Sequence, residues 1–130
     1  MQLHAIETGR FKLDGGAMFG VVPKVIWQKT NPANSNNLID MAMRCLLIED
    51  ESRLILVDTG LGHKYTEKFK GLYEVDHAHS SLEKSLEKLG FNRDDITDVI
   101  HTHLHFDHCG GSTEWNPVKE RHEQIGRAHV

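Results

Sequence analysis

A dense cluster of potential metal ligands constrains this chain more than any other feature of its sequence. Residues 101–111 are HTHLHFDHCGG, in which the spacing H-x-H-x-D-H is formed by His103, His105, Asp107 and His108. Imidazole and carboxylate groups are common ligands of zinc and iron. Four such side chains so close together do not form a packed core, because each would need its own polar partner. The cluster therefore predicts a metal site, with a solvated histidine cluster on the surface as the alternative.

The residues of this cluster resemble those of the metallo-β-lactamase fold superfamily. The family's upstream aspartate follows a strand, and here Asp58-Thr59-Gly60 follows the apolar run Leu54–Val57. The resemblance covers Leu3 to Trp115 and implies an α/β (α+β) fold. That fold is the N-terminal half of a four-layer αβ/βα sandwich, with a mixed sheet and helices on one face. A β-branched run at 96–100 predicts the strand that supports the ligand loop.

Both the resemblance and the local geometry divide the ligands between two ions. In an extended loop His103 and His105 point the same way, whereas Asp107 and His108 do not and suit a second ion. Two zinc ions are expected, with iron or manganese as alternatives, and two neighbouring ions would share one bridging hydroxide. Zinc lowers the pKa of bound water to about 7, so this hydroxide would form at neutral pH. Asp107 is also the predicted catalytic residue, since it could orient this hydroxide and pass on a proton. Asp58 is expected to accept the second N–H of a ligand imidazole, or else to cap its turn.

The length of the chain suggests an incomplete domain. Members of the superfamily are about twice as long, and their C-terminal half supplies two further histidines and a bridging aspartate. We therefore expect residues 1–124 to be the N-terminal part of a metallo-β-lactamase domain. The last six residues, Ile125–Val130, resemble the translation of a common short-read sequencing adapter. They are expected to be a non-native tail, and a natural basic tail is the alternative.

Composition narrows the range of partners. The net charge is −4 with the histidines neutral, and the lysines and arginines are not clustered, so nothing favours nucleic acid. The N-terminus lacks the basic start and apolar core of a secretory signal, and no stretch approaches membrane-spanning length. Cys45 and Cys109 are two lone cysteines rather than a disulfide framework. These observations predict a cytoplasmic protein with a small-molecule substrate and no membrane partner, and they leave the oligomeric state open.

Hydrophobic patterns predict the remaining elements. Strands are expected over 3–13, 41–48 and 54–57, and the continuous apolar runs at 46–48 and 54–57 favour burial on both faces. A capping box that starts at Ser80 predicts a helix ending at Gly90. Gly110-Gly111 is expected to let the chain turn tightly into a following helix. The other candidate side chains lie outside the signature. His63, His77 and His79 are expected to be solvated, with a place at the site entrance as the alternative. His101 is expected to be a hydrogen-bonded structural residue and Cys109 a small buried apolar one, with metal binding as the alternative for both.

The residues between the ligands indicate a branch of the superfamily. Leu104 and Phe106 give H-L-H-F-D-H, which looks like the lactonase-like and general hydrolase branches. The implied function is metal-dependent hydrolysis of a small ester, lactone or thioester. Two alternatives stay open, a non-catalytic half-domain fragment and an iron-dependent oxidoreductase on the same fold.

Overall fold

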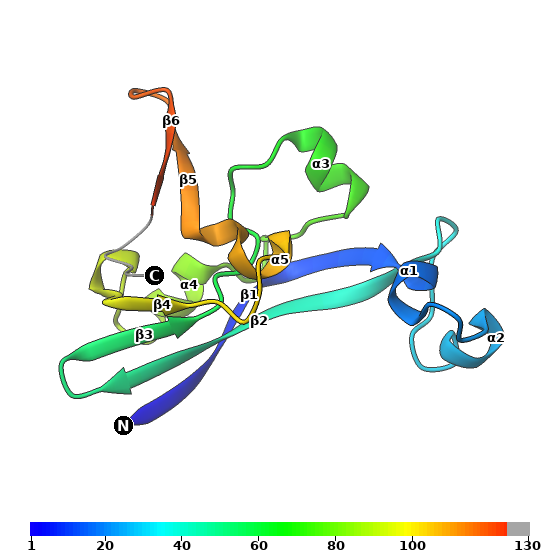
Figure 1. Cartoon of the computed structure of the whole chain (residues 1–130), viewed down its shortest axis with the longest axis horizontal. Coiled ribbons are helices and arrows are strands. Elements are labelled where there is room, and N and C mark those ends of the chain that lie inside the picture. The colour runs from blue at the N-terminus through cyan, green and yellow to red at the C-terminus, as the bar shows by residue number, and fades with distance from the viewer. Residues whose placement is uncertain (125–130) are drawn as a thin grey trace.

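A computed structural model describes residues 1–124, and a four-stranded mixed sheet forms its centre (Figure 1). The strands are ordered β1 (Gln2–Asp14), β2 (Leu38–Asp50), β3 (Arg53–Val57) and β4 (Asp98–Ile100). Neighbours pair antiparallel except β3 and β4, which are parallel. This is the expected α/β architecture with a mixed sheet. The predicted adapter-derived tail, residues 125–130, lies outside the described residues.

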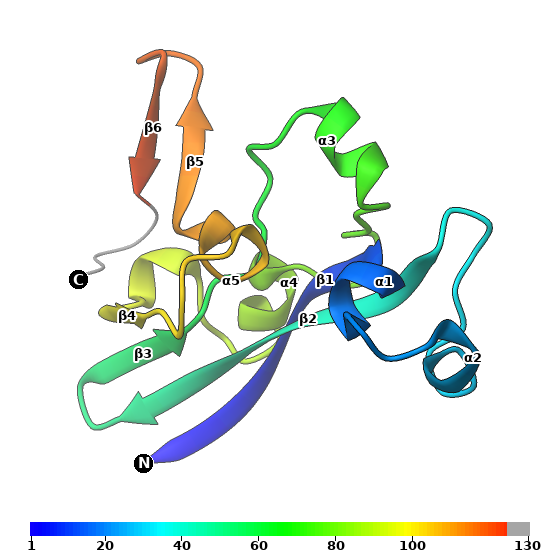
Figure 2. The same ribbon diagram turned by 45° about the vertical axis from the view of Figure 1, so that its right-hand side comes forward.

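Short helices and one β-ribbon connect and flank these strands. Between β1 and β2 lie α1 (Gly15–Phe19) and α2 (Lys24–Trp27); between β3 and β4 lie α3 (Glu67–Leu72), α4 (Leu82–Glu87) and the 3₁₀ turn η1 (Arg93–Asp95). After β4 come α5 (Phe106–Cys109), η2 (Gly110–Ser112) and the ribbon β5 (Thr113–Asn116) with β6 (Arg121–Gln124). Figure 2 shows α5 between the sheet and the projecting α3 and β5–β6. No helix in the part of the chain described here is long and apolar enough to cross a membrane.

The two apolar runs are buried on one face of the sheet only. Leu47, Leu54 and Leu56 are buried and pack with Leu82 and Leu86 of α4. On the other face, Leu46 pairs with Val57 and Ile48 with Ile55, and these side chains are only partly covered. The expected burial on both faces is therefore wrong for the described residues. One face of the sheet remains apolar and accessible.

Helix α4 begins one residue later than its sequence pattern suggested. The hydroxyl of Ser81, not of Ser80, accepts a hydrogen bond from the amide of Lys84. Glu83 instead pairs with His63 over 3.2 Å, and this hydrogen bond outweighs burial and lowers the pKa of Glu83 to about 2. The ring of His77 packs on that of His63. His77 is thus half-buried, and the prediction of a solvated side chain is wrong for it.

A second apolar cluster fixes the position of α5. Phe11, Met43 and Leu61 form its buried centre, and Phe106 from the ligand motif packs against them. The ring centroid of Phe106 lies 4.9 Å from that of Tyr73. Phe106 therefore anchors the first turn of α5 to the body of the protein, and this turn carries Asp107 and His108.

Candidate metal centre

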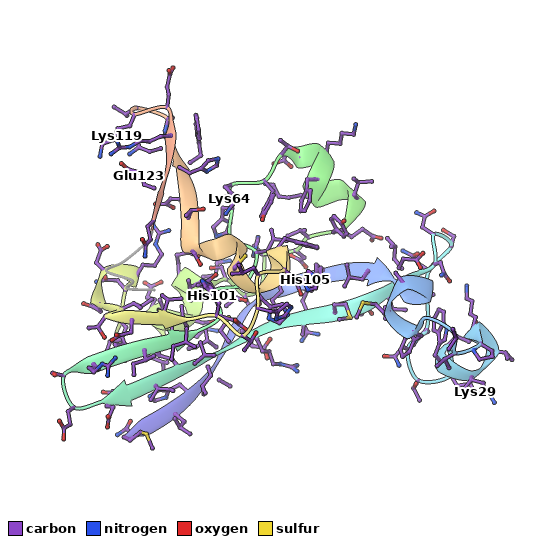
Figure 3. All side chains as sticks on the ribbon, in the orientation of Figure 1. Lys29, Lys64, His101, His105, Lys119 and Glu123 are labelled. Carbon is purple, nitrogen blue, oxygen red and sulfur yellow. The ribbon has the colours of Figure 1, made fainter. Side chains whose placement is uncertain are left out.

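The four motif side chains lie together just beyond the end of β4. The ring centroid of His103 is 4.7 Å from that of His105 and 4.0 Å from that of His108. Oδ2 of Asp107 lies 3.3 Å from Nε2 of His108. Figure 3 shows the labelled His101 and His105 beside α5, where the chain leaves the sheet. The structure thus gathers all four predicted ligands into one cluster.

The backbone through the motif is extended only in its first half. His105 has φ −70° and ψ 149° and occupies the N-cap position of α5. Asp107 and His108 follow within the helix, so the expectation of an extended loop is wrong for these two residues. The helical turn brings their side chains toward each other, whereas an extended chain would point them apart.

Asp58 joins the end of β3 to the ligand loop. Because β3 and β4 run parallel, Val57 pairs with Ile100 and the two strands end side by side. The Asp58 carboxylate accepts hydrogen bonds from the Thr102 amide over 2.9 Å and from Nδ1 of His108 over 2.8 Å. Since a carboxylate only accepts, Nδ1 of His108 carries a hydrogen in this contact. Nε2 of His108, which lies 3.3 Å from Oδ2 of Asp107, is then the nitrogen available to a metal. The hydrogen bond from His108 is the contact expected of Asp58, although its role in metal binding stays a prediction.

Burial and hydrogen bonding act in opposite directions on Asp58. Asp58 is only 6% exposed, and this burial raises the pKa of its carboxyl group. The hydrogen bonds from His108 and Thr102 outweigh burial and hold the pKa of Asp58 below its ordinary value. Its backbone adopts φ +60°, a left-handed conformation that is uncommon for residues other than glycine. The ionised carboxylate is therefore held in place from several sides.

Close backbone contact between two loops explains the glycine pair. The amide of Thr59 donates to the His108 carbonyl, and the amide of Gly111 donates to the Gly60 carbonyl, both over 2.8 Å. A Cβ atom on Gly111 would lie 2.3 Å from the Thr59 carbonyl oxygen, and one on Gly110 would lie 2.4 Å from that of Leu61. The expected turn into a following helix is wrong, because α5 precedes the pair, the pair itself forms the start of η2 and the strand β5 follows. Only glycine fits at these two positions, because a Cβ atom at either one would clash with backbone of the facing loop.

Other side chains support the loop from outside the motif. Nε2 of His101 lies 2.9 Å from the Ser112 hydroxyl, so His101 is hydrogen-bonded as predicted. Lys64 donates to the Gly110 carbonyl and to the Thr113 hydroxyl, both over 2.7 Å. Cys109 is only partly buried. Sequence reasoning missed Thr102 and Lys64, and the only signal for Thr102 was its position between two histidines.

The donor types suit zinc or iron, but the described residues do not complete a site. Within residues 1–124, no three or more His, Cys, Asp or Glu side chains converge closely enough to hold a metal ion. The histidine rings contact one another, and the described motif offers two donors to each of the two predicted ions. A catalytic zinc usually takes three protein ligands and a water. The residues present therefore fit part of a metal centre.

Comparison with known families decides the affiliation of the chain. The family model of the metallo-beta-lactamase superfamily matches residues 44–118, more than half of the sequence. The chain belongs to the metallo-beta-lactamase superfamily. The matched segment includes both the Asp58 turn and the whole ligand motif.

Several members of this superfamily resemble the chain along most of its length. The N-acyl homoserine lactonase of Bacillus cereus is 26% identical over 120 residues, which cover 85% of this chain and 44% of that protein. A probable metal-dependent hydrolase from Staphylococcus aureus superposes with a TM-score of 0.79 at 37% identity, covering 87% of this chain and 41% of that one. AidC, a dizinc quorum-quenching lactonase, superposes with a TM-score of 0.61 at 32% identity, covering 86% and 36% of the two chains. The chain thus spans less than half the length of these relatives.

Proposed function

We propose that the chain is the N-terminal half of a dinuclear metal-dependent hydrolase that acts on a small ester, lactone or thioester. The proposal rests on the hydrogen bond between the Asp58 carboxylate and Nδ1 of His108, which is one of the four clustered motif side chains. Membership of the superfamily supports the reaction class, and the lactonases among the relatives favour a lactone as the first substrate to test.

Each motif residue receives a role in this proposal. His103 and His105 hold one ion, and Asp107 and His108 hold the other. We expect zinc, because a structural relative is described as a dizinc lactonase; iron or manganese is the alternative. When bound, zinc lowers the pKa of a coordinated water to about 7 and so supplies hydroxide at neutral pH. In this proposal the Asp107 carboxylate would accept the proton that the attacking water loses and pass it to the leaving group, which is an oxygen in an ester or lactone and a sulfur in a thioester.

The remaining properties follow from the sequence. The substrate is a small molecule, and neither nucleic acid nor a membrane is a partner in this proposal. The two lone cysteines favour a cytoplasmic location. Lactone turnover measured together with metal content separates this hydrolase from an oxidoreductase on the same fold, because the oxidoreductase would contain iron and would not hydrolyse lactones.

The accessible face of the sheet predicts the behaviour of the 130-residue chain alone. Leu46, Leu3 and Ile100 are 37%, 61% and 52% exposed. Each large aliphatic side chain left in water forgoes about 1.5–3 kcal/mol, against a net domain stability of about 5–15 kcal/mol. We therefore expect this chain to aggregate and to hydrolyse neither lactones nor esters.

The matched comparison is the uninterrupted gene product, by which we mean the protein encoded when the reading frame is followed through genomic DNA past the codon for Gln124. It should be monodisperse, melt cooperatively, contain zinc and hydrolyse lactones. Size-exclusion chromatography, metal analysis and turnover assays on both proteins test this difference. A stop codon directly after Val130 in clean genomic DNA would contradict the half-domain proposal. So would a monodisperse 130-residue protein with a sharp melt and lactone turnover.

A further inference from the structure

Thr102 contacts both the Asp58 carboxylate and the first histidine of the motif. Its hydroxyl oxygen lies 2.8 Å from Oδ2 of Asp58 and 3.0 Å from Nδ1 of His103. Its amide also donates to Oδ1 of Asp58 over 2.9 Å. Thr102 is therefore held against Asp58 by both its amide and its hydroxyl, and the hydroxyl also faces the His103 ring.

The single proton of this hydroxyl determines the direction of the hydrogen bonds. An ionised carboxylate only accepts, so the proton of the Thr102 hydroxyl goes to Asp58. The hydroxyl oxygen then presents a lone pair to Nδ1 of His103, and that nitrogen must carry a hydrogen. In the opposite arrangement, the Thr102 hydroxyl would donate to His103 and turn a lone pair toward the carboxylate 2.8 Å away. Electrostatic repulsion disfavours that arrangement.

We propose that Thr102 is a positioning residue, whose hydroxyl transmits the orienting effect of Asp58 to His103 and fixes Nε2 of that ring as the metal-binding nitrogen. This inference rests on the proposed function, because it assigns His103 to a metal. Asp58 orients His108 directly and His103 through Thr102. One carboxylate thus sets the tautomer of one histidine for each of the two proposed ions.

Two substitutions in the uninterrupted gene product distinguish the contribution of the Thr102 hydroxyl from that of its methyl group. Thr102→Val keeps the shape of the side chain and removes the hydroxyl, whereas Thr102→Ser keeps the hydroxyl and removes the methyl group. Loss of an outer partner of a ligand histidine typically lowers metal affinity about 10–100-fold. We expect that loss for Thr102→Val and near wild-type affinity for Thr102→Ser, measured by competition with a chromophoric zinc chelator. A purely packing role for Thr102 predicts the reverse order.

The histidine tautomers provide a readout that needs neither metal nor activity. In the zinc-free protein, ¹⁵N chemical shifts of the rings should show hydrogen on Nδ1 of His103 in the wild type and in Thr102→Ser, but not predominantly so in Thr102→Val. His108 is an internal control, because its bond to Asp58 does not pass through Thr102.

The outcomes separate this inference from the proposed function. Failure of the wild-type protein to bind zinc would overturn the proposed function. Zinc binding that is unchanged in Thr102→Val would overturn only the role of Thr102. Hydrogen on Nε2 of His103 in the wild type would overturn that role even if the valine variant did not fold.

Discussion

Replacing His105 by alanine in the uninterrupted gene product is expected to remove bound zinc and abolish lactone hydrolysis. The substitution deletes one of the two donors that the described motif offers to the first proposed ion. Even residues that only orient a ligand change metal affinity or activity about 10–100-fold, so the loss of a ligand should lower turnover at least about 100-fold. Metal analysis and initial rates on the same preparation measure both effects.

His79→Ala is the matched control for this experiment. It also removes one imidazole, but His79 is exposed and lies outside the motif. Zinc content and turnover should stay at wild-type levels in this variant. If His105→Ala retained both zinc and activity, the assignment of His105 as a ligand would be wrong.

A single methyl group on Gly111 should strongly destabilise the domain. The new Cβ would lie 2.3 Å from the Thr59 carbonyl oxygen, which belongs to rigid backbone. Forcing atoms into a filled space typically costs about 1–3 kcal/mol, and here the two loops would also separate at the proposed site. We expect the free energy of unfolding of Gly111→Ala in urea to fall by at least this amount, together with zinc affinity.

Gly71→Ala tests whether the effect is specific to the crowded position. Gly71 lies in α3, and a Cβ there would meet no atom within 4 Å. Alanine in a helix is favoured over glycine by about 1 kcal/mol, so this variant should be as stable as the wild type or slightly more so. Equal stability of the two variants would show that the Gly60–Gly111 contact does not constrain the fold.

Local sequence patterns predicted the parts of the fold that depend on neighbouring residues. Alternation and β-branched runs located β1, β2 and β3, and the spacing of the histidines identified the candidate ligands. The cap of α4 was misplaced by one residue, because Ser80 and Ser81 both suit that position chemically. Strand β4 was expected over 96–100 but begins at Asp98, since Ile96 is buried in the core outside the strand.

Contacts between distant segments could not be predicted in the same way. Phe106 had no assigned packing partner in the sequence, yet its burial against Phe11 and Tyr73 decides where α5 begins to turn. The need for glycine at Gly111 arises from Thr59, which is far from it along the chain. The proposed role of Thr102, which follows β4, likewise depends on its contact with Asp58, which follows β3. These features depend on tertiary structure, so the conformational preferences of neighbouring residues do not predict them.

The parallel pairing of β3 with β4 has a consequence for synthesis of the protein. The hydrogen bond between Asp58 and His108 joins residues that are 50 positions apart, and the Thr59 hydroxyl reaches the same residue across 49 positions. Closing so long a loop costs entropy before any contact compensates for it, and such non-local pairing is slow. A nascent chain that has left the ribosome only as far as His108 lacks the bond from Gly111 to Gly60. Until this loop closes, the Asp58 carboxylate is therefore not in place to orient the ring of His108.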